Sequence, residues 1–167
     1  MLKKLKNNIR ARIIGKALAA SNRMVSFPSI HSIKTVGLIT DKYLQTTAFN
    51  KKSFYQANFT QLTYSSQNRP KTDSNQTVFG SDLNFWGIPS EKIINWFTNE
   101  NFDLLIDCTL QNNDVIDYIC AKSKAKFKVS MKNDSKTSDL MINQNDDNLS
   151  VFFDELDNII VNFNTKK

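Results

Sequence analysis

Apolar residues recur every three or four positions in several parts of the chain, which is the spacing of one face of an α-helix. The widest apolar stripe runs from Phe152 to Phe163, and a less regular one runs from Leu2 to Met24. Pro28 ends the second stripe at the latest. The pattern predicts helices over residues 1–24, 43–55, 114–123 and 149–164, and another that begins after Ser90 as its N-cap.

Short apolar runs bounded by polar residues separate these helices and predict strands. Residues 35–40 and 102–107 each contain a short uninterrupted apolar run bounded by polar residues, as expected of strands buried on both faces. Residues 125–131 instead alternate, with Lys126 and Lys128 between apolar neighbours, which predicts one covered face and one wet face. The complete set of predicted strands is 35–40, 59–64, 77–79, 102–107, 125–131 and 139–142.

Strands that alternate with helices are typical of an α/β domain with a mainly parallel sheet. Right-handed crossovers then place helices on both faces of the sheet. We therefore predict a single three-layer α/β domain over residues 33–164. It resembles a Rossmann-like sheet without the glycine-rich loop. Residues 1–32 precede it as a basic N-terminal helix and linker.

Charge is distributed very unevenly along this architecture. The first acidic residue is Asp41, so residues 1–40 carry eight Lys or Arg and a charge of +8, while the remaining residues carry −2. This asymmetry indicates an anionic partner. The residues expected to bind that partner lie in the N-terminal helix: Lys3, Lys4, Lys6, Arg10, Arg12, Lys16 and Arg23.

Three uses of the basic helix remain open. Its apolar stripe could enter the headgroup region of an acidic membrane, with the lysines meeting the lipid. The cations could instead bind RNA or the ribosome through phosphates. The stripe could also pack on the domain, or on a second copy to form a homo-oligomer. No aromatic residue precedes Phe27, so the helix itself offers neither a base-stacking platform nor an interfacial tryptophan.

A second basic cluster follows the predicted helix at 114–123. On an exposed or edge strand, lysines oppose pairing with another chain, which is the simplest role for them. If they faced the same side as the N-terminal helix, they would extend an anionic footprint. The cluster comprises Lys122, Lys124, Lys126, Lys128 and Lys132.

Several kinds of enzyme are disfavoured by what the chain lacks. Only four glycines occur, and neither dinucleotide-binding nor P-loop glycine motifs are present. The single histidine, His31, has no carboxylate or cysteine beside it in the sequence, so histidine-dependent catalysis and a zinc site are not indicated. Cys108 and Cys120 are expected to be buried free thiols. We predict no metal or cofactor, and favour a non-enzymatic module.

The alternative hypothesis is a small enzyme that acts on a sugar or nucleotide. In open parallel sheets, ligands bind outside the carboxyl ends of the strands. Asp41 follows one predicted strand, Asp107 ends another, and Asp82 and Asn84 lie in an aromatic-rich loop. These four residues form the possible ligand rim. Local turn and capping roles are the competing explanation for each of them.

The body resembles a family of small, uncharacterised bacterial proteins of similar length. The matching segments, in order, are Lys34–Asp41 (KTVGLITD), Asp82–Gly87 (DLNFWG), Asn101–Asp107 (NFDLLID), Ser123–Val129 (SKAKFKV), Asp139–Ile142 (DLMI) and Val151–Leu156 (VFFDEL). The resemblance implies an α/β protein of unknown function in the cytoplasm, where attachment would place it on the ribosome or the inner membrane face. It transfers no catalytic residues.

Overall fold

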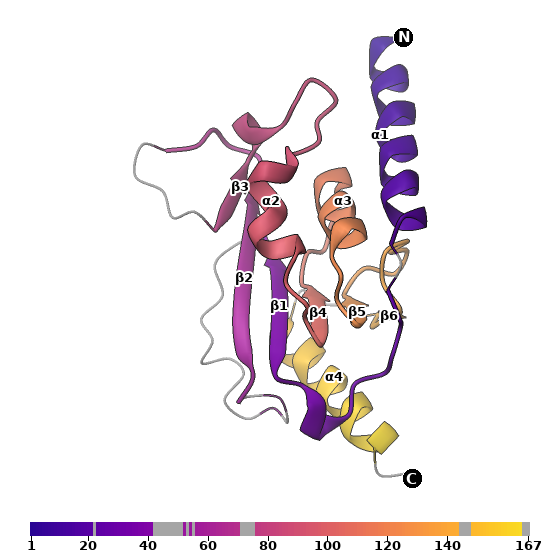
Figure 1. Ribbon diagram of the computed structural model, residues 1–167, viewed down its shortest axis with the longest axis vertical. Helices are drawn as coiled ribbons and strands as arrows, with labels where there is room; N and C mark the ends of the chain where they lie inside the picture. The colour runs from indigo at the N-terminus through magenta and orange to yellow at the C-terminus, as the bar shows by residue number, and fades with distance from the viewer. Residues whose placement is uncertain are drawn as a thin grey trace.

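The computed structural model describes residues 1–21, 23–41, 52, 54, 56–70, 76–143 and 148–164 (Figure 1). The helix predicted over residues 43–55 lies outside this set except at Lys52 and Phe54. The other predicted helices and all six predicted strands fall within it, so the fold can be compared with the sequence pattern element by element.

Six parallel strands form one sheet in the order β3-β2-β1-β4-β5-β6. The chain winds outward from β1 to β3, returns to place β4 beside β1, and winds outward again to β6. The direction of winding therefore reverses between β1 and β4. The strands are β1 (Thr35–Thr40), β2 (Asn58–Ser65), β3 (Thr77–Phe79), β4 (Leu104–Asp107), β5 (Phe127–Ser130) and β6 (Leu140–Met141).

The helices form a layer on each face of this sheet, which confirms the predicted α/β architecture (Figure 1). The elements α1, α2 and α3 cover one face, and α4 covers the other. The N-cap position of α2 is Ser90, as predicted, although its side chain makes no capping bond. The helices are α1 (Leu2–Ala19), α2 (Glu91–Thr98), α3 (Asp114–Lys122) and α4 (Leu149–Asn164), with short 3₁₀ turns at Ile30–Ser32 and Gly80–Asp82.

Alternation along the strands divides the buried side chains into two cores. In β4, Leu104 and Ile106 point toward α4, whereas Leu105 points toward α2 and α3. In β1, Leu38 and Ile39 divide in the same way. Because successive side chains point to opposite faces, each central strand contributes to both cores, and its apolar run is continuous.

The prediction of a wet face on the strand at 125–131 is wrong. The strand is shorter, β6 lies outside it, and α3 covers the face expected to be exposed. Lys128 is only 1% exposed, and its ammonium donates to the carbonyl oxygen of Cys120 in the last turn of α3 at 2.6 Å. A lysine can satisfy a helix-terminal carbonyl in this way, so the alternation reflected a capping role and not a solvated face.

The basic cluster at 122–132 is accordingly not one exposed footprint. Lys128 and Lys132 are buried, Lys122 pairs with Glu91 at 2.6 Å, and Lys126 pairs with Asp103 at 2.7 Å. Four of the five cations are therefore engaged within the domain. Lys124 is exposed.

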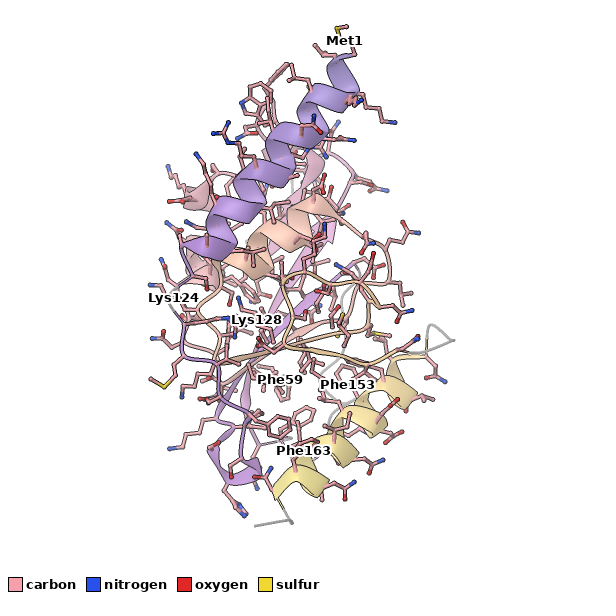
Figure 2. The ribbon with its side chains drawn as sticks, turned by 90° about the vertical axis from the view of Figure 1, so that its right-hand side faces the viewer. Met1, Phe59, Lys124, Lys128, Phe153 and Phe163 are labelled. Carbon is pink, nitrogen blue, oxygen red and sulfur yellow. The ribbon has the colours of Figure 1, made fainter. Side chains whose placement is uncertain are left out.

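The N-terminal helix packs against the domain along its second half. Ile14 is buried, Ile13, Ala17 and Leu18 pack on the same core as α3, and Arg10 pairs with Asp114 at 2.8 Å. The first half differs, because Leu2 and Leu5 remain exposed. Figure 2 shows Met1 at the outer end of α1, far from Phe153 and Phe163 of α4.

The segment after α1 joins the two faces of the domain. Arg23 donates to the carbonyl oxygens of Ala125 and Lys126 and pairs with Asp139. The Phe27 ring then contacts Phe127 in an edge-on arrangement, with 5.1 Å between ring centroids, and also contacts Phe163 at 4.8 Å. Through these contacts, residues 23–27 pass from the α1 side of the sheet to the α4 side.

Two glycine-to-alanine substitutions should have opposite effects on stability. A Cβ at Gly37 would lie 2.8 Å from the Phe102 ring and 2.9 Å from Leu105, so Gly37→Ala should lower the free energy of unfolding by about 2 kcal/mol through overpacking. At Gly15 nothing lies within 4 Å, and Gly15→Ala should raise it by about 1 kcal/mol through helix propensity. Urea denaturation measures both changes, and equal signs would contradict the packing described.

Candidate functional site

A crevice of about 570 Å³ opens at the carboxyl edge of the sheet, where the winding direction reverses. Its walls come from the ends of β1, β2 and β4, from the loop before α3 and from the starts of α3 and α4. Polar side chains predominate around it. The lining residues are Asp41, Tyr64, Ser65, Ser66, Gln67, Cys108, Thr109, Leu110, Gln111, Asn113, Ile116, Met131 and Leu149.

Strand pairing places these groups together. Ile39 of β1 is in register with Asp107 of β4, and the backbone N–H of Cys108 donates to the Ile39 carbonyl oxygen at 2.9 Å. Asp41 and Thr109, two residues beyond each of those positions, consequently emerge from adjacent strands on the same edge. Loops at this edge separate because β1 leads to β2 on one side and β4 leads to β5 on the other, which leaves room for a ligand.

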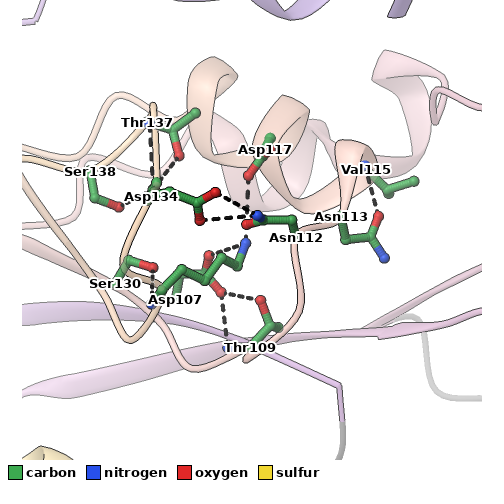
Figure 3. Close-up of polar contacts among 12 residues, drawn as sticks. Asp107, Thr109, Asn112, Asn113, Val115, Asp117, Ser130, Asp134, Thr137 and Ser138 are labelled. Carbon is green, nitrogen blue, oxygen red and sulfur yellow. Dashed lines mark hydrogen bonds and ion pairs between the residues drawn. The ribbon is translucent and has the colours of Figure 1, made fainter. Parts of the chain in front are cut away.

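A buried ion pair lies beneath the crevice. The Lys132 ammonium lies 2.8 Å from Asp107 Oδ2, and both side chains are 1% exposed. The other oxygen of Asp107 accepts hydrogen bonds from the Thr109 backbone N–H at 3.0 Å and the Thr109 hydroxyl at 2.6 Å. Asp117 of α3 approaches the same ammonium at 3.5 Å (Figure 3). This network ties β4 and the residues after β5 to α3.

The network keeps its central cation charged. Burial alone would lower the pKa of Lys132, but the charge of Asp107 and its hydrogen bond outweigh burial, so this pKa lies above its ordinary value. Burial raises the pKa of Asp117, with Lys132 acting in the opposite direction. The Lys132–Asp107 pair therefore resembles a fixed internal salt bridge more than a group poised to transfer a proton.

The start of α3 is held on both sides. The Asn113 side-chain oxygen accepts from the Val115 N–H at 2.9 Å and caps the helix. Asn112 donates to both oxygens of Asp134 at 3.0 and 2.8 Å, which joins this loop to the one after β5 (Figure 3). The crevice wall at 109–113 is thus positioned by contacts to two separate elements.

Cys108 lines the crevice but is poorly suited to nucleophilic chemistry. Burial, together with the nearby charges of Asp107 and Asp41, raises its pKa well above the ordinary value. Since the thiolate and not the thiol is the reactive form, the residue is unreactive at neutral pH. Both cysteines are buried free thiols, as predicted.

The structure brings together only part of the predicted ligand rim. Asp41 and Asp107 lie at the same edge, with Asp41 on the crevice wall and Asp107 buried below it. Asp82 follows β3 and does not line the crevice. Its carboxylate accepts from the Arg69 guanidinium and the Phe79 N–H, both at 2.8 Å. These bonds outweigh burial and hold the pKa of Asp82 below its ordinary value.

Asn84 also has a local role. Its side-chain oxygen accepts from the backbone N–H groups of Trp86 at 2.9 Å and Ile88 at 3.2 Å, which closes the turn containing Gly87 at a φ of 75°. Neither Asp82 nor Asn84 is among the residues that line the crevice.

Sequence reasoning did not find the lysine below the crevice or the wall at Ser65–Gln67. In the sequence, Lys132 lies close to four other lysines and therefore resembles a member of one basic cluster. One available signal was that Asp107 ends one predicted strand, that Lys132 directly follows another, and that the two side chains have opposite charges. The wall after β2 carried no such signal, because Ser65 to Gln67 form an ordinary polar loop in the sequence.

The seven residues predicted to bind an anionic partner, six in α1 and Arg23 after it, divide into three groups. Arg10 and Arg23 form internal ion pairs with Asp114 and Asp139. Lys6 lies 4.0 Å from the centroid of the Phe85 ring. The exposed members are Lys3, Lys4, Arg12 and Lys16.

The described parts of the chain contain no group of three His, Cys, Asp or Glu side chains that could hold a metal ion. His31 is exposed in a 3₁₀ turn near the start of β1, at the opposite edge of the sheet from the crevice. None of the described helices has the length and apolar character that a bilayer span requires.

Fold and site together define a doubly wound α/β domain with a polar crevice at its switch point. Comparison with family models matches residues 6–161 to a family of unknown function (DUF6913), and the chain belongs to that family. The match begins within α1 and ends within α4, so it includes the helix that the sequence pattern set apart as an extension. No curated protein and no solved structure matches the chain.

Removing one member of the buried pair should destabilise the domain strongly. Asp107→Asn leaves the Lys132 ammonium without its close counterion and should lower the free energy of unfolding by about 3 kcal/mol. The double variant Asp107→Asn/Lys132→Met removes both charges and should recover part of that loss. Urea denaturation of the two single variants and the double variant gives the coupling energy, and additive effects would contradict a direct pair.

Lys128 should make stability depend on alkaline pH. Burial, followed by the nearby positive charge of Arg23, lowers its pKa from 10.5 to about 8. The folded protein thus binds this proton less tightly than the unfolded chain. Below pH 8 the burial of the charged lysine lowers the stability of the fold by its full amount, and this loss becomes smaller as pH rises toward 10.5.

Lys128→Met removes that loss of stability. Between pH 7 and pH 9 the wild-type lysine loses its proton only in the folded state, so the wild type gains stability. The free energy of unfolding of Lys128→Met minus that of the wild type should therefore fall by about 1 kcal/mol over this range. Denaturant unfolding of both proteins at the two pH values measures the difference. A pH-independent difference would show that Lys128 titrates normally.

Proposed function

We propose that this protein binds a small hydroxylated molecule, a sugar or a nucleoside, in the crevice at the carboxyl edge of its sheet. The observation that supports this most directly is the position of the crevice. It lies between β1 and β4, where open parallel sheets bind their ligands, and it is lined mainly by hydrogen-bonding side chains. Binding, and not the anionic attachment inferred from charge, is thus the role we assign to the domain itself.

The charge of the lining favours hydroxyl groups over phosphates. Asp41 is the only charged residue among the described lining residues, and no Lys or Arg accompanies it. A carboxylate accepts strong hydrogen bonds from sugar hydroxyls and repels phosphate. Serine, threonine and amide side chains in the lining supply both donors and acceptors, as a ligand with several hydroxyls requires.

The same residues favour binding over covalent chemistry. Among the described lining residues the strongest nucleophile is Cys108, whose pKa is raised by burial. The nearest carboxylate below the crevice, Asp107, is already used by Lys132 and Thr109. The floor of the crevice is therefore a network whose charges are already paired. Such a floor is suited to binding a ligand by shape, since its ordered groups lose little entropy when the ligand binds.

The test is a binding screen with nucleosides and monosaccharides, observed by saturation-transfer NMR on the ligand. At least one of them should bind to the wild-type protein, and Asp41→Asn should weaken that binding about 10-fold, by replacing a charge-assisted hydrogen bond with a neutral one. Gln111→Ala should weaken it less, because an exposed neutral amide contributes a weaker bond.

Glu100→Gln is the matched control. It makes the same change of charge at an exposed carboxylate before β4, at the opposite edge of the sheet, and should leave binding unchanged. The proposal fails if no nucleoside or monosaccharide binds. It also fails if binding is equally strong in wild type and Asp41→Asn.

A further inference from the structure

The first two turns of α1 extend beyond the carboxyl edge of the sheet. Arg10 pairs with Asp114, the first residue of α3, and Ala17 and Ala20 line one surface pocket together with Ala121 and Lys122 at the end of α3. The two helices therefore run in the same direction, and residues 2–9 lie beyond the point where α3 begins. At 1.5 Å per residue, this projection is about 12 Å long. It stands at one end of the molecule (Figure 1).

Large apolar side chains are exposed on this projection and beside it. Leu2 is 64% exposed and Leu5 is 52% exposed. Phe85, which is also 64% exposed, belongs to the turn after β3 and contacts Lys6 of α1. We call Leu2, Leu5, Phe85 and the three lysines among them, Lys3, Lys4 and Lys6, the tip.

The turn that carries Phe85 is held in a fixed conformation. Asn84 accepts the Trp86 and Ile88 N–H groups, and the Gly87 N–H donates to the Asn84 carbonyl oxygen at 2.8 Å. The Trp86 ring meets Phe85 edge-on with 5.0 Å between centroids. The Arg10 side chain of α1 lies beside this turn, since a Cβ added at Gly87 would be 3.2 Å from Arg10 Nε. The exposed ring is therefore presented by structure and does not result from a loose loop.

We propose that the tip docks on the surface of a membrane containing anionic lipid. Leu2, Leu5 and Phe85 enter the interfacial region, and Lys3, Lys4 and Lys6 meet the lipid headgroups. An aromatic ring beside apolar and cationic groups is the composition of interfacial anchors. The sequence of the helix contains no such ring, and folding supplies it from a segment almost eighty residues away.

Two other partners fit the tip less well. RNA would use the lysines but would leave Leu2 and Leu5 in water, because phosphate contacts bury little apolar surface. A second copy of the chain would bring two clusters of three lysines together with no carboxylate in the first forty residues to compensate them. An anionic lipid surface satisfies the apolar and the charged groups at once.

Docking would also orient the crevice. The crevice wall at Asn113 and Ile116 lies at the start of α3, the end beyond which the tip projects. The carboxyl edge of the sheet would then face the membrane. This orientation follows from the parallel packing of α1 and α3, and it does not require the crevice to bind any particular ligand.

The experiment is flotation of the purified full chain with vesicles of 30% phosphatidylglycerol in phosphatidylcholine, compared with phosphatidylcholine alone. Binding should require the anionic lipid and should decrease between 50 and 500 mM salt. The variant Lys3→Gln/Lys4→Gln/Lys6→Gln should reduce the partition coefficient roughly 100-fold, since each lysine near the surface contributes about 5-fold. Leu2→Ser/Leu5→Ser should reduce it at least about 10-fold with the charge unchanged.

Two control variants separate the tip from net charge and general hydrophobicity. Lys34→Gln/Lys124→Gln/Lys136→Gln removes the same charge from exposed lysines elsewhere, and Met141→Ser/Val151→Ser removes exposed apolar residues elsewhere. Both should bind vesicles like the wild type. Circular dichroism checks that every variant is folded.

Insertion has a direct optical signal. In a Trp96→Phe background, Trp86 is the one tryptophan of the chain. Its fluorescence should be quenched by brominated lipid in the anionic vesicles and not when Phe85→Ser/Leu5→Ser is also present. Absence of flotation overturns the proposal, as does flotation reduced equally by the control lysines. Salt-sensitive RNA binding or dimerisation without vesicle binding overturns it as well and identifies the alternative partner.

Discussion

The ion pair between Asp107 and Lys132 connects the elements on which the candidate site depends. It joins the end of β4 to the residues after β5, and through Asp117 it reaches α3. Thr109 donates two hydrogen bonds to the other oxygen of Asp107, and it is also the start of the crevice wall. Because both side chains are buried, separating them would leave a buried charge without its counterion, which favours one geometry for the loops at this edge. Asp107 and Lys132 thus act as a scaffold, and the contacts to a ligand come from side chains above them.

The crevice and the tip lie at the same end of the molecule, and this placement relates the two proposals. The parallel packing of α1 on α3 carries the first two turns past the carboxyl edge, next to the turn that presents Phe85. A domain built this way would hold its crevice toward the surface on which it docks. The two proposals are nonetheless independent: the crevice depends on β1, β4 and the buried pair, whereas the tip depends on α1 and residues 84–87.

The sequence was sufficient to predict the architecture because the two central strands contain short uninterrupted apolar runs and several helices have clear apolar stripes. It was less informative where a charged residue is buried. Lys128 alternates with apolar neighbours in the pattern of a residue on a solvated face. The position of α3 shows instead that its ammonium donates to the carbonyl oxygen of Cys120. Asp41 and Asp107 could share one edge only if their strands were parallel neighbours, and β1 and β4 do pair in parallel. Asp82 and Asn84 could not be separated from a ligand site, because turn-forming and ligand-binding residues are of the same types.

The central claim is that a hydroxylated ligand binds above the Asp107–Lys132 pair. Its most direct test is a ¹H–¹⁵N correlation spectrum of the labelled full chain, recorded during titration with the nucleoside or monosaccharide that binds best. The account predicts that the largest shifts fall on the backbone amides of Asp41, Ser66, Thr109 and Gln111, from three different strand ends. Shifts concentrated elsewhere, for example around His31 at the opposite edge of the sheet, would contradict it.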